Sequence, residues 1–85
     1  MSLDRDVLAA RLLHDYDVAC DELSGLTAPQ REALTLAAKG FEYAAVGQML
    51  GCSHGAVRTR LVKATSRLQC SMAEAIALAA KAGWV

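Results

Sequence analysis

Only three residues, Gly51-Cys52-Ser53, separate two segments whose apolar residues recur with the period of an α-helix. Gly51 can adopt the left-handed conformation that ends a helix, and Ser53 is a favourable N-cap for the next helix. A short helix, a turn of about three residues and a longer helix together form a helix-turn-helix. The sequence therefore predicts this unit, with helices at about residues 42–50 and 54–68.

The same periodicity, together with capping residues, predicts three further helices. Thr27 and Gln30 form a capping-box pattern at the start of one helix, and Ser71 and Glu74 repeat the pattern at the start of another. Alanine and leucine are abundant and proline occurs once, a composition that suits helices. The predicted fold class is all-α, a small bundle of about five helices that includes an extra N-terminal helix. The further helices are expected at residues 3–23, 28–39 and 72–82.

Both helices of the predicted helix-turn-helix have an apolar face that is expected to turn towards the core. In the longer helix the apolar residues recur at intervals of four, three and four, which places them on one narrow face. In the shorter helix the face comprises Val46, Met49 and Leu50. In the longer helix it comprises Val57, Leu61, Ala64 and Leu68.

The opposite face of the longer helix has the side chains that reading of duplex DNA requires. Small or hydroxyl-bearing residues let a helix approach the bases closely. Arg58 can reach a guanine edge, and Val62 or the methyl group of Thr59 can contact a thymine methyl group. Lys63 and three nearby side chains are better placed to meet phosphates or the DNA backbone. Those three are His54, Arg60 and Arg67. A basic solvated helix in an ordinary bundle is the alternative interpretation.

The formal net charge is zero, but the charges are segregated along the chain. Residues 1–25 contain six acidic and two basic residues, a balance of −4. Residues 53–68 contain four basic residues and no acidic one. The sequence therefore predicts a local positive field around the longer helix that suits phosphate, although the total charge does not indicate a nucleic-acid binder.

Other residue types exclude several classes of function. The chain has three widely spaced cysteines and no pair separated by two residues, which argues against a disulfide framework and a zinc site and favours reduced thiols in a cytosol. The two histidines, His14 and His54, have no obvious ligand companions, and no motif organises a catalytic triad or a phosphate-binding loop. We therefore expect no enzyme, no metal and no cofactor. The apolar stretch 75–80 is too short to cross a bilayer and no secretion signal is apparent, so the expected location is cytoplasmic.

A spaced set of residues resembles the helix-turn-helix domains of LuxR-type (GerE-type) transcription regulators. The set begins with Leu26-Thr27 and Arg31-Glu32 and continues through Leu34, Leu36, Ala38, Gly40, Val46, Leu50, Gly51, Ser53, Val57, Arg58, Leu61, Leu68 and the run 73–79. The resemblance implies a four-helix DNA-binding domain over residues 26–85 that dimerises through its last helix. It implies base contacts by Arg58, Thr59 and Val62, and backbone contacts by Thr27, Ser53, Arg60, Lys63 and Arg67.

The chain is equally similar to region four of bacterial sigma factors, which reads promoter DNA with the same motif. The similarity rests on Tyr43, the run 57–61, Ala64 and Arg67-Leu68. Two residues depart from the LuxR-type pattern. Glu42 stands where that family usually has a serine cap, and Gly47 replaces an alanine, at a cost of up to about 1 kcal/mol in helix propensity.

The last predicted helix has a face of small residues that favours close approach of a second helix. This face is the expected dimer interface, and its residues are Met72, Ala73, Ile76, Ala77 and Ala80. Residues 1–25 are expected to form a separate acidic helix that is a former linker, a dimer element, a docking surface for polymerase or a cover for the core.

The predicted function is a sequence-specific, double-stranded DNA-binding transcription regulator of bacterial, cytoplasmic origin that acts as a homodimer. The recognition helix spans about residues 53–68 and lies in the major groove. The alternative is a protein-interaction module that docks on RNA polymerase, a sigma factor or another regulator without reading DNA. The acidic first helix, the zero net charge and Glu42 support that alternative.

Overall fold

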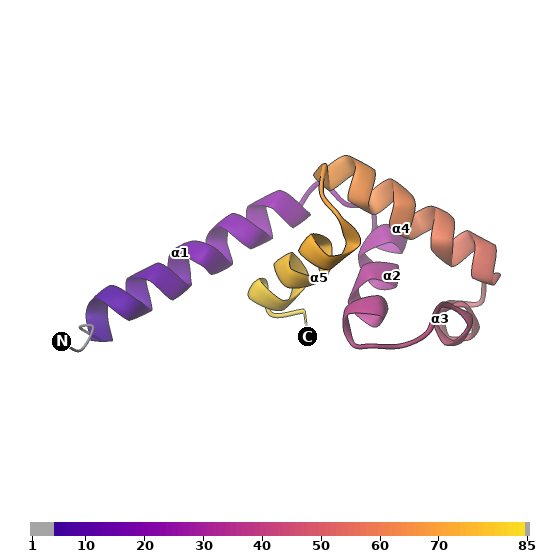
Figure 1. The fold of residues 1–85 in the computed structure, drawn as a ribbon, viewed down its shortest axis with the longest axis horizontal. Helices are drawn as coiled ribbons and strands as arrows, with labels where there is room; N and C mark the ends of the chain where they lie inside the picture. Colours follow the sequence, from indigo (N-terminus) through magenta and orange to yellow (C-terminus); the bar gives the residue numbers. More distant parts are fainter. Residues whose placement is uncertain (1–4, 85) are drawn as a thin grey trace.

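The computed structural model describes the backbone of residues 5–84 and the side chains of residues 13–84, and it is built from α-helices (Figure 1). The helices are α1 (Arg5–Leu23), α2 (Ala28–Ala38), α3 (Tyr43–Leu50), α4 (His54–Leu68) and α5 (Met72–Lys81). The all-α fold class and the five helices are therefore confirmed. The predicted start of the first helix at residue 3 lies outside the described residues.

Local capping interactions determine where three of the helices begin. At α2, the Thr27 hydroxyl accepts a hydrogen bond from the Gln30 backbone N–H at 3.3 Å, and the Gln30 side chain accepts one from the Thr27 N–H at 3.1 Å. At α5, Ser71 and Glu74 form the same reciprocal pair. At α4, the Ser53 hydroxyl accepts from the third residue of the helix. Both predicted capping boxes and the predicted Ser53 cap are confirmed.

The C-terminal end of α4 lacks the glycine that commonly ends a helix. Gln69 takes the left-handed conformation instead, with φ of 53°. Its N–H donates to the Ser66 carbonyl and the Cys70 N–H donates to the Thr65 carbonyl, both at 3.2 Å. These two bonds form a Schellman motif, which satisfies carbonyl groups that the end of a helix leaves open. The last helical residue agrees with the prediction, although Gln69 itself was not identified as a stop from the sequence.

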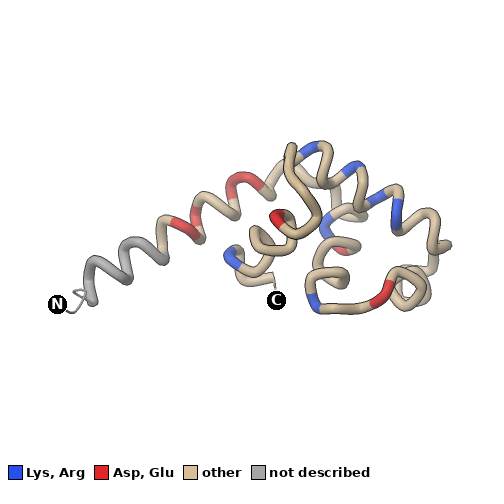
Figure 2. Tube along the Cα trace, viewed as in Figure 1, with Lys and Arg blue, Asp and Glu red and all other residues tan. Residues whose placement is uncertain are grey.

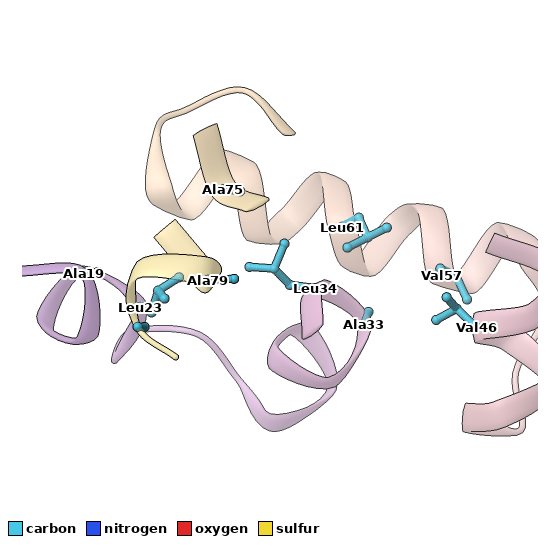
Figure 3. Packing of buried hydrophobic residues seen from close by; sticks show 10 residues of the cluster. Ala19, Leu23, Ala33, Leu34, Val46, Val57, Leu61, Ala75 and Ala79 are labelled. Carbon is cyan, nitrogen blue, oxygen red and sulfur yellow. The ribbon is translucent and has the colours of Figure 1, made fainter. Parts of the chain in front are cut away.

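The core forms where α2 lies against α3, α4 and α5 (Figure 3). Leu34 of α2 is fully buried, and it lies between the alanines of α5 and Leu61 of α4. The end of α1 contributes to the same core, because its Ala19 and Leu23 are buried where α1 packs on α5. Small residues predominate in α5, and this lets its backbone approach α1 and α2 closely. The buried residues of α5 and the turn after it are Ala75, Ala79 and Ala82.

One residue of the predicted inner face of α3 is exposed rather than buried. Val46 is fully buried and Leu50 is half-buried, as predicted, but Met49 is 52% exposed. The helix has only eight residues, and the other buried residue besides Val46 is Gly47. At about 100° per residue, Met49 lies on nearly the opposite side of the helix from Gly47. The contact through Gly47 therefore turns Met49 towards solvent.

The N-terminal part of α1 extends beyond the bundle (Figure 1). The radius of gyration is 14.8 Å and the longest dimension is 51 Å. A compact domain of this length would have a radius of gyration of about 12 Å. The described side chains of α1 that share the core lie in its last turns. Within the described residues, no helix has both the length and the hydropathy needed to cross a membrane.

Candidate nucleic-acid interface

The turn between α3 and α4 depends on the absence of a side chain at Gly47. A Cβ atom at this position would lie 2.6 Å from the carbonyl oxygen of Cys52, which is shorter than any ordinary contact. The Gly47 carbonyl accepts the Cys52 N–H at 2.9 Å, and Gly51 takes a φ of 70° to make this bond possible. The sequence suggested that Gly47 only weakens the helix. The structure corrects this interpretation, because the glycine is what permits the close contact that holds α4 against α3.

The two faces of α4 are separated as the sequence predicts. Val57, Leu61 and Ala64 are buried, and Leu68 is half-buried against the same cluster. Val62 lies on the opposite side and is 56% exposed. An apolar side chain of this size on the surface of a polar helix face is available for contact with another molecule.

The predicted base-reading residues lie together in the N-terminal part of the exposed face of α4. Arg58, Thr59 and Val62 are all exposed and fall within the first nine residues of a 15-residue helix. In helix-turn-helix proteins this end of the second helix contacts the base edges. His54 opens the helix, and its ring lies tilted against Tyr43 of α3 with 5.8 Å between the ring centroids. The two rings form one border of the exposed face.

The predicted backbone-contacting residues lie just before α2 and along α4. The Thr27 and Ser53 hydroxyl oxygens accept capping hydrogen bonds, so each hydroxyl hydrogen can still be donated to a phosphate. Lys63 is exposed and Arg60 is half-buried. Towards the end of α4, the Arg67 side chain lies beside Gly25, in the turn between α1 and α2. The remaining predicted contact, His54, is exposed at the start of α4.

Charge is distributed unevenly over the fold (Figure 2). Four basic residues lie along α4, whereas the acidic residues of the described part of α1 lie along that helix. Glu42 precedes α3 as its N-cap residue, but its side chain makes no capping hydrogen bond. Four of the positive side chains of the described residues are therefore concentrated on one helix, α4.

Comparison with known families agrees with this geometry. Residues 21–68 match the family described as Sigma-70, region 4, and this segment is more than half of the chain. The chain belongs to the sigma-70 region 4 family. The family has a non-enzymatic DNA-binding helix-turn-helix fold. No curated protein and no solved structure matches the chain.

The match supports one of the two resemblances found in the sequence. It begins in the last turn of α1 and ends with α4, so the helix-turn-helix of this region 4 protein lies entirely inside it. The α5 helix lies outside the match, and the resemblance to LuxR-type domains is not confirmed.

The predicted dimer face of α5 is partly occupied by the protein's own fold. Met72 and Ile76 are half-buried against the core, whereas three alanines of the set are exposed. Those alanines are Ala73, Ala77 and Ala80. After α5, Trp84 is half-buried, and the Arg31 guanidinium lies 4.6 Å from its ring centroid. Trp84 therefore covers the core at the junction of α5 and α2.

The three cysteines are free, half-buried thiols. Burial raises the pKa of Cys70, and the nearby carboxylates of Glu74 and Glu22 raise it further. A raised pKa keeps this thiol protonated at neutral pH and makes it a weaker nucleophile. Within the part of the chain whose side chains the structure describes, no group of three potential ligands is placed to hold a metal ion.

Proposed function

We propose that this sigma-70 region 4 protein binds double-stranded DNA in a sequence-specific manner and thereby regulates transcription. The proposal rests on the residues of the exposed face of α4. Arg58, Thr59 and Val62 project from the N-terminal part of a helix that contains no acidic residue and is braced from behind by α3. A helix of this kind fits the major groove, where each base pair presents a distinct pattern of donors, acceptors and methyl groups.

The contacts in this proposal divide into two classes. Arg58 donates two hydrogen bonds to a guanine, while Thr59 and Val62 contact neighbouring bases. Lys63 and Arg67, which share one side of α4, meet phosphates beside the groove and contribute affinity without sequence preference. A homodimer through α5 that reads a two-fold site stays a prediction of the sequence.

The proposal predicts different effects for two single substitutions in α4. Arg58→Ala should weaken binding to the preferred site by about 1–3 kcal/mol and relax the base preference at one position. Lys63→Ala should weaken binding to all sequences and reduce the slope of log K against log salt by about one. The preferred site would first be selected from random duplexes, and each variant would then be titrated by fluorescence anisotropy at several salt concentrations.

Lys81→Ala is the matched control, because it removes an exposed positive charge from α5 and leaves α4 intact. It should leave affinity and salt slope nearly unchanged. Unaltered affinity and base preference in Arg58→Ala would contradict the proposed reading of DNA by α4.

A second candidate function is docking on RNA polymerase, which the family match and one surface feature support. A groove of about 400 Å³ lies between α2 and α3, and its lining is mainly apolar. Leu36 and Leu50 form its apolar part, and Arg31 and Glu32 supply charge. Ala28 and Thr35 complete the lining. An open apolar groove with charged residues in its lining suits an amphipathic helix of a partner.

Docking on polymerase predicts capture of purified bacterial core RNA polymerase in the absence of DNA. Thr35→Arg introduces a long charged side chain into the groove and should abolish this capture. The double variant Arg58→Ala/Lys63→Ala should retain it, since neither residue lines the groove. Capture by Thr35→Arg at the level of the unmodified protein would exclude the groove as the docking site. Circular dichroism of each variant would establish that the fold is intact.

A further inference from the structure

One side of α1 has one apolar and two acidic side chains that are exposed in the described chain. Leu13 is 63% exposed. Asp17 and Asp21 are exposed, and they follow Leu13 at intervals of four residues, so they lie on the same side of the helix. Tyr16 lies instead on the side of the buried Leu23, and its ring is beside Gly83. We call Leu13, Asp17 and Asp21 the α1 strip.

The position of α1 keeps this strip away from the core. Among the side chains of α1 that the structure describes, only Ala19 and Leu23 are buried, and the preceding turns of the helix extend past α5 (Figure 1). This projection accounts for a radius of gyration of 14.8 Å. A helix that projects from a small bundle and exposes large apolar side chains gains stability when another surface covers it.

The acidic residues of α1 are placed against the preference of an isolated helix. Negative charge is unfavourable near a helix C-terminus, where the partial charge of the backbone is also negative. Asp21 and Glu22 lie in the last turn of α1, and that turn contains no basic residue. These acidic residues therefore do not stabilise α1 itself. They are free of that role and can pair with a positively charged surface outside the bundle.

The exposed face of α4 provides a complementary surface. Val62 is 56% exposed and lies between Arg58 and Lys63, so an apolar side chain is flanked by cations. The α1 strip has the opposite arrangement, with Leu13 beside Asp17. In the folded chain α1 packs on α5, and α1 and α4 extend in different directions from there (Figure 1). The two surfaces can therefore meet only between separate molecules.

We propose that the α1 strip of one molecule binds the exposed face of α4 of a second copy. Burial of Leu13 against Val62 supplies the apolar part of the contact, and the aspartates face the cations. This association covers Arg58 and Lys63, so it competes with DNA. The competition rests on the proposed function, whereas the self-association does not.

The test reverses the charge of each surface in turn and measures self-association of the full chain at low salt by sedimentation velocity. Asp17→Lys/Asp21→Lys should weaken self-association about tenfold, and Arg58→Glu/Lys63→Glu should weaken it similarly, because each variant brings like charges together. Raised salt should also weaken the self-association of the unmodified protein, because it screens the attraction. An equimolar mixture of the two variants should associate again, because each reversed strip meets a reversed partner surface.

Asp15→Lys/Glu22→Lys is the matched control for net charge. It changes the net charge by the same amount as Asp17→Lys/Asp21→Lys does, but Asp15 and Glu22 lie on the other side of α1. It should retain self-association within about twofold. A mixture of the two charge-exchange variants that stays monomeric would overturn the proposal. Loss of association in Ala77→Glu alone would also overturn it, since that result would place the contact on α5.

A DNA titration separates this proposal from the proposed function. At protein concentrations where the chain is monomeric, Asp17→Lys/Asp21→Lys should bind DNA at least as well as the unmodified protein. At concentrations where the unmodified protein associates, added duplex should dissociate the assembly. An assembly that binds DNA without dissociating would overturn the proposed contact on α4 even if DNA binding itself is confirmed.

Discussion

Replacement of Gly47 by alanine is expected to destabilise the fold by about 1–3 kcal/mol, the range for forcing extra atoms into a well-packed site. The new Cβ would lie 2.6 Å from the Cys52 carbonyl oxygen, and that oxygen belongs to backbone that cannot swing aside as a flexible side chain would. The turn would have to open, and α4 would move relative to α3. Urea denaturation followed by circular dichroism measures the loss of stability.

Gly55→Ala provides the internal comparison. Gly55 is also a helical glycine, but a Cβ there would meet only the Ser53 hydroxyl oxygen, at 4.0 Å. This substitution should therefore stabilise α4 by about 0.5–1 kcal/mol, because alanine loses less backbone entropy in a helix. Equal stability changes in the two variants would mean that the close contact at Gly47 has no energetic consequence.

Leu34→Ala is expected to have the largest effect on stability, a loss of about 3–5 kcal/mol. Leu34 is the largest fully buried side chain, and it fills the space where α2, α4 and α5 meet. Alanines of α5 line part of this space and cannot extend to fill a cavity. A domain of this size has a total stability of roughly 4–13 kcal/mol, so the variant should melt at a far lower temperature.

Met49→Ala is the control for the loss of Leu34, because it removes a side chain of similar size that is 52% exposed. It should change the free energy of unfolding by less than about 0.5 kcal/mol. Thermal melts of both variants measure the difference. A loss for Leu34→Ala as small as that for Met49→Ala would contradict the position of Leu34 at the centre of the core.

The helix boundaries could be predicted because the interactions that determine them are local. Both capping boxes form within four residues of sequence, Thr27 with Gln30 and Ser71 with Glu74. The residue types and their spacing are therefore enough to predict these hydrogen bonds. The residue that ends α4 is the exception. Gln69 takes the left-handed conformation there, and its residue type does not predict this, because surrounding contacts can hold any residue in that conformation.

The candidate interface could be predicted for a related reason. The spacing of Val57, Leu61 and Ala64 identifies the buried side of α4, and the exposed position of Arg58 and Val62 follows from the helical period. Charge segregation along the chain also indicated which helix is basic. Met49 was assigned wrongly because a helix of eight residues is too short for its apolar positions to define a single face.

The sequence by itself determined the all-α class, the capping residues and the basic, exposed face of α4, since each follows from helical period or from bonds between near neighbours. Only the tertiary structure decided the role of Gly47, the orientation of Met49 and the projection of α1. Each of these depends on how closely two segments approach in space, and that distance is set by packing of the whole bundle rather than by any short stretch of sequence.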